Sequence, residues 1–467
     1  MKKKILCVLM IAVLVIGAVT MFACNPSNAG AQANFDVPAG GYDGSAITLK
    51  FYHTMGENLR TVLEAHIVEF NKLYPNITIE HEQVGSYDDV RDQISTEITV
   101  GNQPNIAYCY PDHVAMYNVA GAVVQLDNLI ASTETVTRAD GTTETLGLTD
   151  AQKNDFIQGY YNEGKQFGDG LMYTMPLNKS TEVLYYNKTF FDENNLKLPT
   201  TWAELETLCA TIKSIDPDCI PLGYDSEANW FITMCQQNGW GYTSAEGNNY
   251  LFNNENTIAW LTEIRDYYDM GYLTTQEDYG AYTSGLFTKG VNDGGLVYCI
   301  GSSGGASHQD PAGAFEWGIA PVPGSVQADG TTVNYSAISQ GPSLVMLSAG
   351  YNVDNVEEKQ LMTWLFVKEL LNPTFQAAFS IGSGYNPCRL STLEVPDYAE
   401  HMSDDTNITA VAAKVASTMF DRFYTSPAFK GSSTARSQVG SALVYAMTSQ
   451  KTPAEALEDA YRNCGGK

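Results

Sequence analysis

Apolar and polar positions after residue 45 alternate between the two-residue period of strands and the spacing of helices. Partial alternation over 47–52 predicts a strand, and apolar positions three or four apart over 59–73 predict a helix. The same order recurs as a strand over 77–79, a helix over about 87–100 and a strand over 104–108. Strands that alternate with helices in this way indicate an α/β sheet.

A second series of elements begins near residue 175. Residues 183–186 are β-branched and aromatic, as in a buried strand, and 189–194 can form a short helix. Pro199 forces the residue before it away from helical geometry. Thr201 and Glu204 then have the spacing of a capping box, which predicts a helix start at residue 202.

The rest of the chain continues the α/β pattern. A polar, Thr-rich stretch over 131–148 is interpreted as a surface loop. Residues 296–300 predict a strand that runs into the Gly-rich segment 301–305. Further helices are predicted over 202–215, 230–240, 257–270 and 361–371.

The N-terminus has the features of a targeting segment. Lys2–Lys4 form a basic start, and 5–23 are apolar up to Cys24. This run is about long enough to span a bilayer, so an uncleaved anchor is one interpretation. The small residue before Cys24 and the polar stretch after it favour a lipoprotein signal peptide over 1–23, with Cys24 lipidated and a flexible tether over 24–45. Either interpretation places the body outside the cytoplasmic membrane.

Composition and charge restrict the class of protein. The 467 residues are 44% hydrophobic, enough for more than one domain. The 53 acidic and 26 basic residues give a formal net charge of −27. Such a field repels phosphate backbones, which argues against nucleic-acid binding.

No pattern of metal ligation or catalysis is found in the sequence. The nine cysteines include no CxxC pair, and the six histidines form no HExxH motif. Cys209 and Cys219 are near enough to form a disulfide, although buried thiols are the favoured interpretation. The Gly-rich segments 301–305 and 382–384 lack the context of a hydrolase nucleophile. We expect no metal, cofactor or enzymatic activity.

The stretch 175–205 carries the most specific signal. Its YYNK at 185–188 and its PTTWAEL at 199–205 would fit any strand–turn–helix of an α/β domain, but together they resemble the extracellular solute-binding proteins of ABC importers, solute-binding family 1. Matching strings in the N-terminal part occur in the family's order. Within the family, the chain is most similar to sn-glycerol-3-phosphate-binding proteins.

The resemblance implies a two-lobed α/β fold of the periplasmic-binding-protein type II class. The chain would cross three times between the lobes, with a cleft between them. It implies that lobe I comprises 46–178 and 319–370, and that lobe II comprises 179–318 and 371–467.

The resemblance also implies a ligand site. The family's contact positions fall on residues with hydroxyl, aromatic or backbone groups: Tyr87, Ser180, Trp230, Ser302, Gly341 and Tyr385. A plain structural role at each position is the alternative.

Two positions depart from the family pattern. Pro111 stands where an acidic residue is expected, with Asp112 next to it. The expected phosphate-pairing arginine has no clean match, and Arg436 and Arg389 are the candidates. Tyr52 and His53, at the end of the first strand, are further candidates, although His53 could equally be a structural histidine.

The resemblance implies a lipid-anchored, monomeric binding protein on the extracytoplasmic face of the cell membrane. It would close by hinge motion on a carbohydrate or glycerol-3-phosphate-type solute and deliver it to an ABC permease. The alternative is a secreted carbohydrate-active hydrolase or an adhesin on a similar scaffold.

Overall fold

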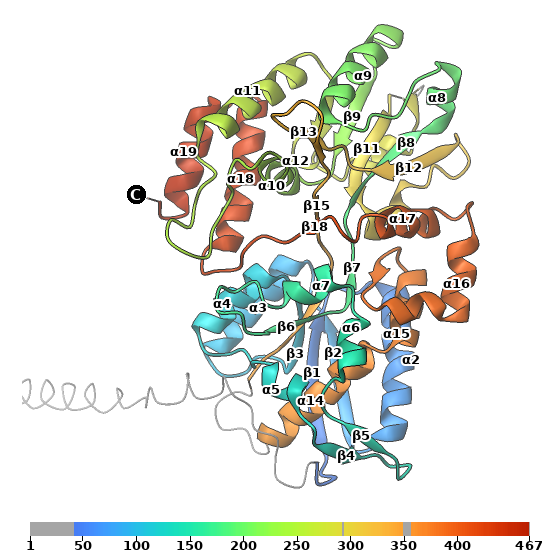
Figure 1. Ribbon diagram of the computed structural model, residues 1–467, viewed down its shortest axis with the longest axis vertical. Coiled ribbons are helices and arrows are strands. Elements are labelled where there is room, and N and C mark those ends of the chain that lie inside the picture. The colour runs from blue at the N-terminus through green and yellow to red at the C-terminus, as the bar shows by residue number, and fades with distance from the viewer. Residues whose placement is uncertain (1–41, 292–293, 349–355, 467) are drawn as a thin grey trace, which may run out of the picture.

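The computed structural model describes residues 42–291, 294–348 and 356–466. Figure 1 shows two lobes stacked along the long axis, with connecting segments between them. Each lobe holds a five-stranded sheet with helices packed against it, which confirms the two-lobed α/β prediction. The predicted leader, Cys24 and all but the end of the tether lie outside the described residues.

The sheet of lobe I contains one antiparallel strand, β16, which comes late in the chain. Its order is β2 (Ile77–Gln83), β1 (Ile47–His53), β3 (Ile106–Cys109), β16 (Ser343–Met346) and β6 (Thr174–Pro176). β1 runs parallel to β2 and β3, and β16 pairs antiparallel with both β3 and β6. Around this sheet lie α2 (Glu57–Leu73), α3 (Tyr87–Ile98), α4 (Pro111–Val119), α5 (Asp127–Ala131), α6 (Asp150–Asn154), α7 (Gln158–Glu163) and α14 (Val356–Leu370).

The sheet of lobe II has the order β10 (Leu273–Thr275), β9 (Ile220–Tyr224), β11 (Leu296–Ser302), β8 (Glu182–Asn187) and β12 (Trp317–Pro321). Its helices are α8 (Lys188–Glu193), α9 (Trp202–Ile215), α10 (Glu227–Asn238), α11 (Glu255–Asp269), α12 (Gln276–Tyr279), α13 (Ser284–Phe287), α17 (Ile408–Ser417), α18 (Ser432–Met447) and α19 (Pro453–Asn463), with the 3₁₀ segment η2 (Ser303–Gln309).

Local signals fixed the start of α9 as predicted. The Thr201 hydroxyl accepts from the Glu204 N–H, and the Glu204 carboxylate accepts from the N–H of Thr201. This capping box satisfies backbone donors that have no partner inside the helix. The Thr-rich stretch predicted as a loop instead contains a hairpin of β4 (Thr135–Thr137) and β5 (Thr143–Thr145).

The described chain passes between the lobes three times, as predicted. The first crossing is β7 (Asn178–Lys179), and the second leads from β15 (Ala337–Ile338) into β16. The third runs from β17 (Asn386–Pro387), which pairs with β7, through η3 (Leu390–Glu394) and α16 (Pro396–Ser403) to α17. β18 (Phe423–Tyr424) then pairs with β15 beside the crossings.

The predicted lobe boundaries need two corrections. Residue 319 does not begin the return to lobe I, because β12 pairs with β8 and so completes the sheet of lobe II. The hairpin of β13 (Ser325–Val326) and β14 (Val333–Asn334) follows β12. Residue 371 does not begin lobe II either, because α15 (Pro373–Ile381) packs on α2 and buries Phe375 and Phe379 in the core of lobe I.

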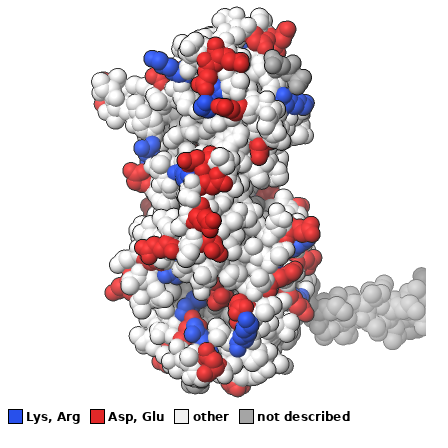
Figure 2. Space-filling view, turned by 90° about the vertical axis from the view of Figure 1, so that its right-hand side faces the viewer, with Lys and Arg blue, Asp and Glu red and all other residues white. Residues whose placement is uncertain are grey.

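The cysteines of the described chain are unpaired. Cys209 and Cys219 are free and buried, as the favoured interpretation predicted. None of the helices in the described ranges combines the length and the hydropathy of a membrane span. Figure 2 shows Asp and Glu spread over both lobes of one face, in keeping with the acidic composition.

Candidate ligand-binding cleft

Three adjoining cavities lie between the lobes. Their volumes are about 440 Å³, 450 Å³ and 50 Å³, and Arg436 and Tyr110 line all three. Tyr110 comes from lobe I and Arg436 from α18 of lobe II. The cavities therefore form one cleft to which both lobes contribute.

The ends of the central strands supply several of the lining residues. Tyr110 follows β3, Asp225 follows β9, and Ser302 ends β11. Ligands of open α/β sheets bind outside the carboxyl ends of the strands. The two sheets direct these ends toward the same gap.

A chain of buried polar groups holds Arg436 in the cleft. Its guanidinium donates to the Asn229 side-chain oxygen, and the Asn229 amide donates to Glu182 over 2.9 Å. The Tyr224 hydroxyl donates to the other oxygen of Glu182 over 2.5 Å. Burial raises the pKa of Glu182 to about 7, although these hydrogen bonds and the charge of Arg436 oppose the shift.

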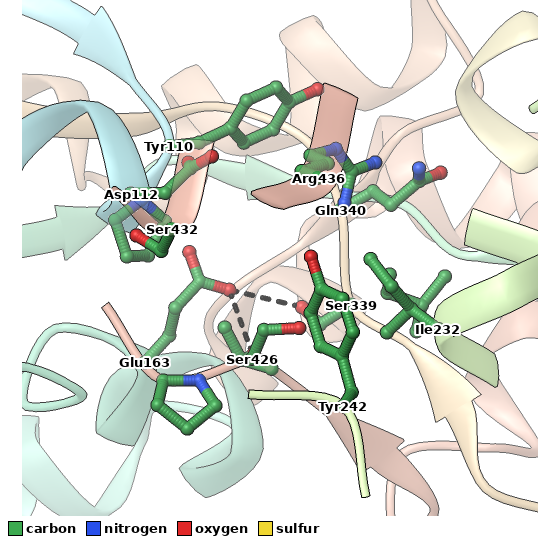
Figure 3. Close-up of a pocket in the computed structure, with 14 residues that line it drawn as sticks. Tyr110, Asp112, Glu163, Ile232, Tyr242, Ser339, Gln340, Ser426, Ser432 and Arg436 are labelled. Carbon is green, nitrogen blue, oxygen red and sulfur yellow. Dashed lines mark hydrogen bonds between the residues drawn. The ribbon is translucent and has the colours of Figure 1, made fainter. Parts of the chain in front are cut away.

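The smallest cavity brings charged groups of both lobes together. Figure 3 shows Asp112 and Glu163 of lobe I on one side, with Tyr242 and Arg436 of lobe II on the other. Glu163 accepts from Ser339 over 3.2 Å. An anion, an amine or a hydroxyl group entering here would meet partners of either sign.

Tyrosine rings form one wall of the cleft. Tyr87 stacks on Tyr110 with ring centroids 4.5 Å apart. Tyr385 lies against Gly304 so closely that a Cβ there would be 2.8 Å from its ring. Removal from water raises the pKa of Tyr87 and of Tyr385, so both hydroxyls stay protonated and can donate hydrogen bonds.

Asp225 is held at the floor of the cleft. One of its oxygens accepts from both the N–H and the hydroxyl of Thr283 over 2.7 Å. Burial raises the pKa of the Asp225 carboxyl. The side chain is fixed by its own lobe and presents its remaining oxygen toward Gln309, 3.4 Å away.

Residues 65–410 match the bacterial extracellular solute-binding proteins. The chain belongs to this family. This membership confirms the resemblance in the sequence and the role of a binding protein for an ABC importer, and it places the protein outside the cytoplasm.

Individual proteins to which the chain is similar are also solute-binding proteins. The periplasmic sn-glycerol-3-phosphate-binding protein UgpB of Salmonella paratyphi A is 24% identical over 363 residues, 74% of this chain and 76% of that protein. UgpB of Mycobacterium tuberculosis, solved with glycerophosphocholine, superposes with a TM-score of 0.70 at 16% identity over 90% of this chain and 98% of that one. The ABC substrate-binding protein Lmo0181 of Listeria monocytogenes, solved with cycloalternan, superposes with a TM-score of 0.69 at 16% identity. The match covers 90% of this chain and 99% of that one.

Most of the site residues predicted for this solute-binding protein lie in the cleft. The cavity of about 440 Å³ brings together Tyr87, Ser180, Ser302, Tyr385 and Arg436. Asp112 lines the two neighbouring cavities. Their contact with a ligand remains a prediction.

Trp230 is not placed in the cleft. It is 3% exposed in the core of lobe II, where it stacks on Tyr224 at 4.7 Å and meets Trp260 edge-on at 5.8 Å. Consecutive helix positions differ by about 100° around the axis. On α10, Asn229 therefore takes the direction toward Glu182 and Arg436, and Trp230 points into the core.

Tyr52 and His53 also lie outside the cavity lining. The Tyr52 hydroxyl donates to Glu97 over 3.1 Å. His53 is fully buried, accepts at Nδ1 from the Met55 N–H over 3.1 Å, and has Nε2 3.0 Å from His81. Burial lowers the pKa of His53 to about 3, which makes it the neutral structural histidine of the second interpretation.

Gly341 and Arg389 have structural positions. Gly341 has φ +91°, and a Cβ there would be 2.8 Å from the Asn178 carbonyl oxygen, so this crossing requires glycine. Arg389 pairs with Asp155 at 2.7 Å and lines a separate cavity on lobe I. Of the two arginine candidates, Arg436 alone lies in the cleft.

The sequence reasoning missed Tyr110, Glu182, Asp225 and Asn229. Tyr110 and Asp225 directly follow buried strands, a position that could have signalled them. Glu182 lies just outside the predicted strand 183–186, whereas β8 begins at Glu182. Asn229 had no local signal, since its role depends on α18, which is distant in sequence.

Proposed function

We propose that this protein binds a small polyhydroxylated solute, of the carbohydrate or glycerol-3-phosphate type, in the cleft around Arg436 and delivers it to an ABC permease. The observation that carries this proposal is the lining of one cleft by both lobes, with Arg436 on all three cavities. Such a site can sense whether the lobes are closed over a ligand.

The lining suits solute hydroxyl groups and C–H faces. Serine hydroxyls, amides and carboxylates can donate to or accept from hydroxyls, and tyrosine rings can cover apolar faces. The named relatives bind glycerol 3-phosphate, glycerophosphocholine and cycloalternan. Hydroxyl groups are the chemistry that these solutes share.

Contacts across the cleft support closure of the lobes on the solute. Arg91 of α3 donates to the Ser433 hydroxyl of α18 over 3.2 Å. Arg91 also pairs with Asp88 and Asp92, so it is fixed on lobe I. A hinge motion that opens the cleft would break the bond to Ser433.

A hydrolase is the rival function, because Glu182 and Asp225 line the same cavity. Glycoside hydrolysis needs two carboxyl groups that are free to act on the substrate. Here both oxygens of Glu182 and both oxygens of Asp225 already accept hydrogen bonds within lobe II. The arrangement favours binding without turnover.

A thermal-shift and calorimetry screen of glycerol 3-phosphate, its diesters and small oligosaccharides tests the proposal. One solute should raise the melting temperature and be recovered unchanged by mass spectrometry. Arg436→Ala should abolish the shift, whereas Arg462→Ala, which removes an exposed arginine of α19, should retain it. Turnover of the solute, or full binding by Arg436→Ala, would contradict the proposal.

We extend the proposal to the membrane. Cleavage before Cys24 and lipidation of its thiol would anchor a monomeric protein on the extracytoplasmic face of the cell membrane. A single tether leaves the two lobes free to move and to dock on the permease.

A further inference from the structure

A series of hydrogen bonds connects the floor of the cleft to the guanidinium of Arg436. It runs from Tyr224 through Glu182 and Asn229. Glu182 is 3% exposed and Asn229 is 1% exposed. Both oxygens of Glu182 are engaged, by Tyr224 at 2.5 Å and by Asn229 at 2.9 Å. The hydrogen-bonded route from the carboxylate to Arg436 therefore runs through the amide of Asn229, and the two charges also attract each other through space.

The amide of Asn229 has one orientation that satisfies both neighbours. Its NH₂ group donates to Glu182, which leaves its oxygen to accept from the guanidinium of Arg436. A flipped amide would point NH₂ at a cation and oxygen at a carboxylate. Glu182 thus fixes the direction in which Asn229 holds the guanidinium.

The charges around the cleft set what Arg436 can attract. Among the described residues that line the three cavities, Arg436 is the only Arg or Lys. The carboxylates that line them are Asp88, Asp112, Glu163, Glu182, Asp225, Glu227 and Glu277. Two of them have cations of their own, because Glu163 pairs with Lys179 and Asp88 with Arg91. A doubly charged anion that reaches the guanidinium must still approach the other carboxylates, and like charges in a closed cleft repel strongly.

We propose that Glu182 is a positioning and specificity residue that orients Arg436 through Asn229 and counterbalances its charge, so that the cleft favours uncharged polyols over phosphate dianions. This inference rests on the proposed function. It narrows the solute from the carbohydrate or glycerol-3-phosphate type to the uncharged polyols alone. Tyr224 keeps Glu182 in place. The other ionisable side chains on the same cavity are Asp225, His308, Arg436, Tyr87, Tyr110, Tyr282 and Tyr385.

Glu182→Gln tests the counterbalancing charge, with glycerol 3-phosphate as the calorimetric probe at pH 8. The amide keeps the size of the side chain and removes its charge, so glycerol 3-phosphate should bind at least about tenfold more tightly than to the wild type. Glu193→Gln is the matched control, because it removes an exposed carboxylate of lobe II that lines none of the three cavities. It should change the affinity by less than about threefold.

Sulfate gives a second readout, because its charge is constant over the relevant pH range. Sulfate affinity of the wild type should rise as the pH falls through about 7 and Glu182 gains a proton, and the rise should vanish in Glu182→Gln. His308→Gln should retain this rise in sulfate affinity, which would show that the histidine does not cause it. This variant tests the inference even if Glu182→Gln does not fold.

Three results would overturn the inference: unchanged glycerol 3-phosphate affinity in Glu182→Gln, an equal gain in Glu193→Gln, or a sulfate affinity of the wild type that is independent of pH. Each of these results leaves the proposed function intact if a polyol still raises the melting temperature of the wild type and is recovered chemically unchanged. Absence of binding by every polyol and anion, in every variant, would overturn both proposals.

Discussion

The ammonium of Lys179 lies 2.6 Å from the carboxylate of Glu163, and both side chains are buried where the crossings meet. Lys179 belongs to the first crossing and also donates to the Gly341 carbonyl of the second over 2.9 Å. The Glu163 carboxylate accepts from the hydroxyl of Thr425, which lies on the segment that follows the third crossing, over 3.3 Å. One ion pair therefore connects the segments between the lobes.

Lys179→Met should lower the free energy of unfolding by about 3–5 kcal/mol, because it leaves the Glu163 carboxylate buried without its cation. Urea denaturation measures the loss. Lys165→Met, which changes an exposed lysine near α7, should cost less than about 1 kcal/mol. Equal losses in the two variants would show that the buried pair is not what stabilises the hinge.

Gly304→Ala should weaken solute binding while Gly285→Ala does not. A Cβ at Gly304 would be 2.8 Å from the ring of Tyr385, whereas nothing lies within 4 Å of one at Gly285, which is exposed and lines none of the three cavities. The displaced ring would disturb the cleft wall, and we expect an affinity loss of about tenfold or more. Calorimetry with the solute found in the screen compares the pair, and matched affinities would exclude a binding role for Tyr385.

Trp230→Phe should retain solute affinity. Trp230→Ala should lower the free energy of unfolding by about 3–5 kcal/mol, because removal of the large side chain leaves a cavity in the core. The stacking on Tyr224 places this ring among packed side chains. Denaturation and binding measured on the same samples separate the two effects. A tenfold affinity loss in a stably folded Trp230→Phe would restore Trp230 as a ligand contact.

The raised pKa of Glu182, about 7 against an ordinary 4.5, makes stability depend on pH. The folded protein holds a proton here that the unfolded chain releases between these values. The contribution is complete below about pH 4.5, declines as the pH rises to about 7 and then stays constant. The melting temperature of Glu182→Gln minus that of the wild type should therefore increase from pH 5 to pH 8, and a constant difference would contradict the shift.

Cys24→Ala should release the protein from the membrane fraction without altering solute affinity. Lipidation requires the thiol, and the cleft is built from residues beyond the tether. Phase partitioning in detergent measures the anchor. An equally membrane-bound variant would instead support the uncleaved hydrophobic anchor over 5–23.

Elements defined by neighbouring residues could be predicted from the sequence, and those defined by distant partners could not. The capping box at Thr201 contains all its partners within four residues, and α9 starts where predicted. The placement of β12 depended on the free edge of β8, which only the folded sheet reveals. The bond between Asn229 and Arg436 joins residues separated by 207 positions, which no local pattern encodes.

The late position of β16 constrains how this protein is made. β16 (Ser343–Met346) lies between β3 and β6 and pairs with both, so the edges of these two strands in the sheet of lobe I stay open while more than two thirds of the polypeptide is synthesised. Long-range pairing of this kind is slow, and open edges invite aggregation. The sheet of lobe I can therefore be completed only after Met346 has been made, so the order of synthesis delays the folding of the lobe that comes first in the chain.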